Sequence, residues 1–129
     1  MSITTPVLYY KLDGNSNDSI GSNNGTDTSI TYSVANGKII QGAGSDAGTD
    51  RIYIGNPTAV QISGSQSINF WIKASSQGAN NRSVFYAGGI DGISDIGIGF
   101  FHYGSTQYLE FQASNGSSLS VATLSKKDS

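Results

Sequence analysis

The chain has 129 residues, of which 36% are apolar and 12% are charged, and 7 basic residues against 9 acidic ones give a net charge of −2 at pH 7. This is the length of one ordinary domain, so residues 1–129 are expected to form a single unit. Binding to a nucleic-acid backbone requires a basic face, which this charge balance does not supply. Because cysteine is absent, there is no disulfide framework, no thiolate nucleophile and no sulfur ligand for zinc.

Uncharged polar residues dominate the expected surface. Serine, threonine, asparagine and glycine make up 57 of the 129 residues, a composition that suits loops and uncharged polar partners. No apolar run approaches the roughly 18 residues of a membrane span, and the N-terminus lacks the basic and apolar regions of a signal peptide. We therefore expect synthesis in the cytoplasm without a leader, and no membrane insertion.

Short segments in which apolar residues recur with period 2 predict β-strands along the whole chain. In chain order they span residues 7–12, 29–34, 38–41, 51–54, 67–73, 83–87, 96–103, 108–113 and 118–124. Clusters of glycine, asparagine and serine separate them, as turns require. No segment keeps a period of 3.6 for three turns. The predicted fold is therefore all-β, an antiparallel β-sandwich or jelly roll with almost no helix.

Three stretches of the first half carry a family resemblance. They are residues 9–26, "YYKLDGNSNDSIGSNNGT", residues 36–56, "NGKIIQGAGSDAGTDRIYIGN", and residues 67–73, "SINFWIK". In this order and spacing, residues 7–73 resemble the laminin-G-like domains of the concanavalin A type, which implies a jelly-roll sandwich. The closing strands typical of that family are not visible before Ser129, so the sandwich is expected to lack its last strands.

Two expectations about partners follow, one from this resemblance and one from a second resemblance. Sheet edges left open by missing strands recruit other protein chains, which favours an oligomer or an assembly component. The glycine- and asparagine-rich texture also resembles lectin-like proteins of phage particles. This second resemblance implies a place on the surface of a virion or particle, with an extracellular surface as the alternative.

The opening stretch offers oxygen ligands for a hard cation. Asp13, Asn15, Asn17 and Asp18 supply carboxylates and amides within six residues. The family resemblance implies a structural Ca²⁺ near this loop, with Asp13, Asn17 and Asp18 as the predicted ligands. The alternative is that these side chains cap turns through their own backbone. The loop with Asp46 and Asp50 also has two interpretations. Its acids either form a second set of cation ligands or the rim of a sugar site, or the loop is only a flexible connection between strands.

The second half contains a candidate site for a glycan or a cell-surface polysaccharide. Sugar recognition requires aromatic faces for C–H groups and acids or amides for hydroxyls. Such side chains lie close together in the sequence and flank two predicted strands: Asp91, Asp95, His102, Tyr103, Gln107 and Tyr108. The alternative is a hairpin whose aromatic residues fill the core. Trp71, the only tryptophan, is expected to be buried under a loop, with a stacking role as its alternative.

Catalysis is not expected. Glycoside hydrolysis requires two carboxylates at the scissile bond, and Glu110 is the only glutamate of the chain. Its strand, "YLEFQ", places Tyr108 and Gln112 on the same face instead of a second acid. The sequence thus favours a non-catalytic carbohydrate-binding or adhesion module. A purely structural virion or assembly protein is the first alternative, and a fragment of a glycoside hydrolase is the second.

Overall fold

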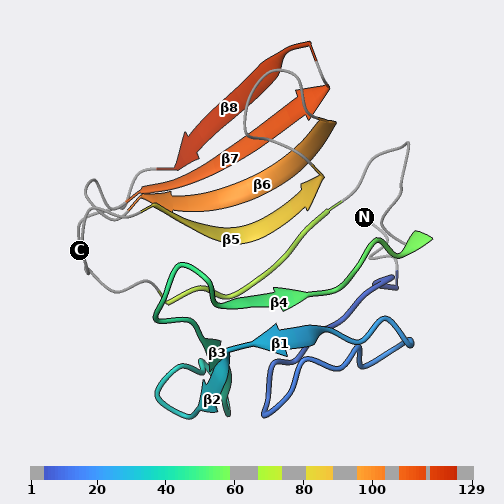
Figure 1. Ribbon diagram of the computed structural model, residues 1–129, viewed down its shortest axis with the longest axis vertical. Coiled ribbons are helices and arrows are strands. Elements are labelled where there is room, and N and C mark those ends of the chain that lie inside the picture. Colours follow the sequence, from blue (N-terminus) through green and yellow to red (C-terminus); the bar gives the residue numbers. More distant parts are fainter. Residues whose placement is uncertain are drawn as a thin grey trace. The chain divides into compact units, whose positions relative to one another are not determined.

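A computed structural model describes residues 5–58, 67–73, 81–88, 96–103, 108–115 and 117–124. In these segments the regular elements are β-strands in small antiparallel sheets, with no helix among them (Figure 1). The predicted all-β class is confirmed. The chain divides into two compact units, Met1–Trp71 and Ile72–Ser129. The described residues contain no helix of the length and apolarity that crossing a membrane demands.

The first unit contains two small sheets. Strand β1 (Thr26–Thr28) pairs with β4 (Arg51–Tyr53), and β2 (Thr31–Ser33) pairs with β3 (Gly42–Gly44), both antiparallel. A hydrogen bond between side chains joins the two sheets. The hydroxyl of Tyr32 in β2 donates to Oδ2 of Asp27 in β1 at 2.8 Å. Burial and this bond raise the pKa of Tyr32, which keeps its hydroxyl protonated as the donor.

The β2–β3 hairpin closes through glycines at two positions where the backbones meet. A Cβ atom at Gly37 would lie 2.5 Å from the carbonyl carbon of Gln41, and one at Gly42 would lie 2.5 Å from the carbonyl oxygen of Asn36. Two turn bonds hold the same loop, from the amide of Asn36 to the carbonyl of Ser33 and from that of Gly37 to Val34, both 3.2 Å. No larger side chain fits at Gly37 or Gly42 unless the backbone moves.

The second unit contains one four-stranded antiparallel sheet in the order β5–β6–β7–β8 (Figure 1). The strands are β5 (Asn81–Gly88), β6 (Ile96–Tyr103), β7 (Tyr108–Asn115) and β8 (Leu119–Leu124). Each strand pairs with the next along the chain, as in a meander. The register pairs Phe100 of β6 with Phe111 of β7, and it shifts once, between Ser83 and Phe85 of β5.

Six of the nine predicted strands are confirmed to within two residues at each end. They are the predictions for 29–34, 51–54, 83–87, 96–103, 108–113 and 118–124. In five of these segments apolar residues alternate along the chain. The exception is 83–87, in which Val84, Phe85 and Tyr86 follow one another. All six segments have a neighbouring strand to pair with.

Three predicted strands are wrong. Residues 7–12 form only a single bridge, from Tyr10 to Asp18. Residues 38–41 belong to the loop between β2 and β3, because the chain has to reverse there and the strand begins at Gly42. Residues 67–73 alternate in exposure up to Trp71 but form no strand. Alternation predicts an extended backbone and does not supply a pairing partner. Strand β1 was not predicted, since its sequence "TDT" contains no apolar residue.

Candidate functional site

Asp18 lies at the centre of the opening loop and stabilises it through hydrogen bonds. Its side chain is only 6% exposed. Its Oδ1 atom accepts the backbone amides of Tyr9 and Ile20, both at 3.2 Å, and Oδ2 accepts Nδ2 of Asn23 at 3.5 Å. The amide of Asp18 itself donates to Oδ1 of Asn24 at 3.0 Å. One carboxylate therefore ties three parts of the loop to each other.

Two further polar contacts complete the loop. The hydroxyl of the buried Ser16 donates to the carbonyl oxygen of Gly25 at 3.1 Å, and the amide of Gly25 donates to the carbonyl oxygen of Ser16 at 2.8 Å. A Cβ atom at Gly25 would lie 2.5 Å from Cγ2 of Ile52 in β4, so the loop packs closely against that strand. Asn15 accepts the amide of Asn17 at 2.9 Å, in the manner of an Asx turn. The polar cluster thus supplies the bonds of a folded loop.

The electrostatics of the loop keep Asp18 ionised. Burial alone raises the pKa of Asp18, but the hydrogen bonds from Tyr9, Ile20 and Asn23 outweigh it, so its pKa lies below the ordinary value. The hydroxyl of Tyr10 donates to the carbonyl oxygen of Asn23. Burial, and then the negative charge of Asp18, raise the pKa of Tyr10. The loop is built around a carboxylate and a protonated phenol.

The predicted calcium ligands occupy different environments in this loop. Asp13 is half-buried, Asn17 is exposed and Asp18 is buried. Because Oδ1 of Asp18 already accepts two amides, its lone pairs are engaged inside the loop. Within the described segments, no three acidic, histidine or cysteine side chains come together as a metal-binding group. Calcium binding by Asp13, Asn17 and Asp18 stays a prediction.

The loop with Asp46 and Asp50 has a turn of its own. Oδ2 of Asp50 accepts the amides of Asp46 and Ala47, both at 2.8 Å, and the amide of Asp50 donates to the carbonyl of Ala47 at 3.2 Å. The side chain of Asp46 is exposed. Asp50 therefore stabilises the connection between β3 and β4 through its backbone contacts.

The backbone of the second unit brings three predicted ligand residues to one end of the sheet. Tyr103 of β6 pairs directly with Tyr108 of β7, and His102 is the next residue along β6, opposite Leu109. Asp91, Asp95 and Gln107 lie outside the described residues. The side chains of His102, Tyr103 and Tyr108 lie outside them as well. The predicted glycan site in this region stays a prediction.

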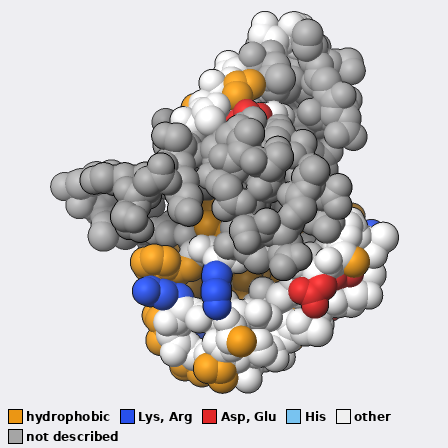
Figure 2. All heavy atoms as spheres, turned by 90° about the vertical axis from the view of Figure 1, so that its left-hand side faces the viewer, with side chains coloured by type: hydrophobic (Ala, Val, Ile, Leu, Met, Phe, Trp, Pro, Cys, Tyr) orange, Lys and Arg blue, Asp and Glu red, His pale blue; other side chains and the backbone are white. Residues whose placement is uncertain are grey.

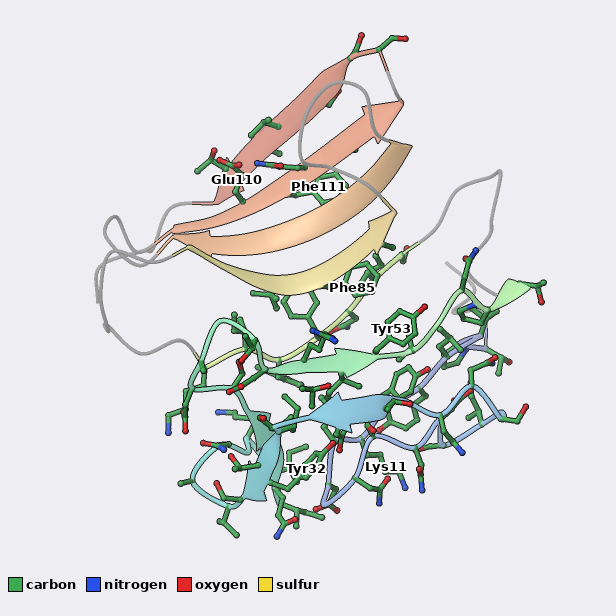
Figure 3. The ribbon with its side chains drawn as sticks, in the orientation of Figure 1. Lys11, Tyr32, Tyr53, Phe85, Glu110 and Phe111 are labelled. Atoms are coloured by element: carbon green, nitrogen blue, oxygen red, sulfur yellow. The ribbon has the colours of Figure 1, made fainter. Side chains whose placement is uncertain are left out.

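Glu110 lies on β7 with an amide beside it. It is 8% exposed, and Nε2 of Gln112 donates to its Oε1 atom, which confirms that the two side chains share a face. Its partners in register are Phe101 on β6 and Thr123 on β8, neither of them acidic. Figure 3 shows Glu110 and Phe111 on adjacent positions of this strand. The expectation that the protein does not catalyse glycoside hydrolysis stays a prediction.

Trp71 is the residue that the sequence misplaced. It is 78% exposed, so the predicted burial under a loop is wrong. The Nζ atom of Lys38 lies over its ring, 5.8 Å from the ring centroid. We call this pair the Trp71–Lys38 surface. The alternation in residues 67–73 indicated this exposure, since Trp71 lies two residues after the exposed Asn69 and therefore on the same face of an extended segment.

The loop that contributes Lys38 is apolar at its surface. Val34, Ile39 and Ile40 are all exposed, Ile39 by 86%. Figure 2 shows hydrophobic side chains and Lys or Arg side chains adjoining one another on the described surface of the molecule. Apolar and cationic groups thus lie together on the described surface.

Comparison with known proteins adds no assignment for this surface. The resemblance of residues 7–73 to laminin-G-like domains therefore enters only as a proposal. No family model, no curated protein and no solved structure matches the chain.

Proposed function

We propose that the protein is a non-catalytic carbohydrate-binding or adhesion module. The observation that carries the proposal is the exposure of Trp71. Tryptophan is highly buried on average in folded proteins, because its ring is a large apolar surface. An indole left in water is available to stack against the C–H face of a sugar. Covering a large apolar side chain stabilises a complex by about 1.5–3 kcal/mol.

Other described features support the same function. Tyr53 on β4 is a second exposed aromatic side chain (Figure 3). The surface is rich in hydroxyl and amide groups, which match the hydroxyls of a sugar. The proposed architecture is a jelly-roll sandwich of the laminin-G type, and the proposed location is the surface of a virion or particle. Individually weak sites gain strength there through repetition.

Trp71→Ala is expected to weaken glycan binding by at least about tenfold and to leave folding intact. A glycan array identifies the ligand, and calorimetry then measures the dissociation constant of each variant. Since Trp71 is the only tryptophan, a shift of its fluorescence on titration reports occupancy of the site directly.

Val7→Ala is the matched control, because it removes an exposed apolar side chain of the same unit outside the loop that contains Lys38. It is expected to bind as tightly as the wild type. Trp71→Phe, which retains an aromatic face, is expected to fall between the two. Equal affinity of Trp71→Ala and the wild type would refute a stacking role for Trp71.

A second function, assembly with other protein chains, is favoured by the exposure of β8. This strand pairs with β7, and no other strand among the described residues pairs with it. Its residues 120–123 are exposed on both faces of the sheet. None of the six residues of β8 is charged or proline, the usual protection of a sheet edge. The partner would be a second copy that extends the sheet through β8.

Val121→Lys tests this assembly. A lysine on an edge strand discourages pairing with another strand, so multimers of the wild type are expected to dissociate in the variant. Light scattering measures the mass, and circular dichroism checks that the exposed position tolerates the change. Thr123→Ser, on the same strand, is the control. A monomeric wild type at high concentration would contradict assembly through β8.

A further inference from the structure

We propose that the Trp71–Lys38 surface selects an anionic sugar, one whose ring carries a carboxylate, over its neutral counterpart. The inference rests on the proposed function, in which Trp71 stacks against a sugar ring. It adds a second determinant, the charge of Lys38, and with it the chemical class of the ligand.

The ammonium group of Lys38 is available to a ligand. At 5.8 Å from the ring centroid it lies near the outer limit of a cation–π contact, about 6 Å, so the indole holds it weakly. Lys38 is exposed, and among the described residues no carboxylate forms an ion pair with it. An ammonium group has three donors and no acceptor, so its natural partner is an anion.

The backbone below Lys38 is held in place. Lys38 follows Gly37, whose amide donates to the carbonyl of Val34, and the Cα of Gly37 lies against the backbone of Gln41 and Gly42. A loop fixed by such contacts loses little conformational entropy when a ligand binds. The cation is therefore presented from a defined position, although its side chain keeps its own rotamers.

The two groups match the two parts of an acidic sugar. The apolar face of the sugar ring covers the indole. The ammonium group of Lys38, which lies over the indole in the free protein, then turns through its side-chain rotamers to the substituents at the edge of the sugar ring. A carboxylate there accepts a charge-assisted hydrogen bond, which is stronger than a bond to a hydroxyl. A neutral sugar makes the stacking contact and lacks the ionic one.

The test compares two oligosaccharides of equal length, a trimer of galacturonic acid and a trimer of galactose. They differ at C6, where one carries a carboxylate and the other a hydroxymethyl group. Titration of the whole protein, followed by Trp71 fluorescence and calorimetry, is expected to show about fivefold tighter binding of the acidic trimer at low salt. The preference is expected to shrink in 0.5 M salt because the contact is exposed, at an ionic strength where screening acts over about 4 Å.

Three variants separate charge from stacking. Lys38→Gln is expected to remove the preference for the acidic trimer and to leave affinity for the neutral trimer unchanged. Lys38→Arg keeps the charge and is expected to keep the preference. Lys11→Gln removes an exposed lysine from the opening loop and is expected to keep it too.

Equal binding of the two trimers by the wild type would overturn the charge preference and leave stacking on Trp71 standing. A preference that survives in Lys38→Gln would also overturn it. Binding of neither trimer, with no response on a broad glycan array, would overturn the proposed function and this inference with it.

Discussion

Asp18→Asn is expected to lower the melting temperature of the protein by several degrees. The carboxylate of Asp18 accepts the amides of Tyr9 and Ile20 on one oxygen, and it receives the side chain of Asn23 on the other. An asparagine keeps the shape but replaces one acceptor by a donor and removes the charge that strengthens these bonds. Thermal unfolding of the wild type and the variant at pH 7 measures the difference.

The pH dependence of the same variant has a definite sign. The pKa of Asp18 is lowered in the folded protein, so between that value and the unfolded value of about 3.9 the unfolded chain binds more protons. The contribution of Asp18 is therefore complete above the unfolded pKa and is lost as the pH falls through the folded pKa. Melting curves between pH 2 and 7 are expected to fall less steeply in acid for Asp18→Asn than for the wild type.

Asp46→Asn is the control, because the side chain of Asp46 is exposed. It is expected to melt as the wild type does. Adding calcium or EDTA separates the two interpretations of the loop. Ligation of calcium by Asp13, Asn17 and Asp18 predicts that EDTA lowers the melting temperature of the wild type alone. Identical melting of Asp18→Asn and the wild type at every pH would contradict the role of Asp18 in the loop.

Gly42→Ala is expected to reduce the free energy of unfolding by about 1–3 kcal/mol, as overpacking does elsewhere. The added methyl would lie 2.5 Å from the carbonyl oxygen of Asn36 and 2.9 Å from the Cα of Gly37. All of these atoms belong to the backbone, so no side chain can rotate to relieve the contact. Urea unfolding monitored by circular dichroism measures the loss.

Gly55→Ala separates this contact from the general effect of replacing a glycine. A Cβ at Gly55 meets nothing within 4 Å, and its φ of +70° makes alanine unfavourable by conformation alone. Such a conformation costs an ordinary residue about 1–2 kcal/mol. A loss in Gly42→Ala that comes with an unchanged β2–β3 hairpin and is far below the loss in Gly55→Ala would contradict the close approach.

The strands of the second unit could be predicted from the sequence because their information is local. In β6 the bounds agree at both ends, since Ile96, Ile98 and Phe100 alternate within the eight residues of the strand. Residues 38–41 and 67–73 have comparable apolar content and are not strands. Among the described residues neither segment pairs with a neighbouring strand, and no local pattern reports on strand pairing.

The candidate site, too, could be predicted only where its information is local. The spacing of Asp13, Asn15, Asn17 and Asp18 indicated a polar loop, and it also left turn formation as one of two explanations. It did not reveal that Asp18 turns inward, because the amide of Tyr9 that it accepts lies nine residues away. The exposure of Trp71 was missed because the family resemblance was given more weight than the alternation of apolar and polar residues in its own segment.

The close backbone contacts at Gly37 and Gly42 also mean that different residues of the hairpin determine its backbone path and its surface chemistry. The backbone path depends on two residues without side chains and on two turn bonds between main-chain atoms. Lys38, Ile39 and Ile40 project from that path into solvent. Substitutions at those three positions are therefore expected to change the surface chemistry of the loop at little cost in folding, whereas a side chain at Gly37 or Gly42 would change its path.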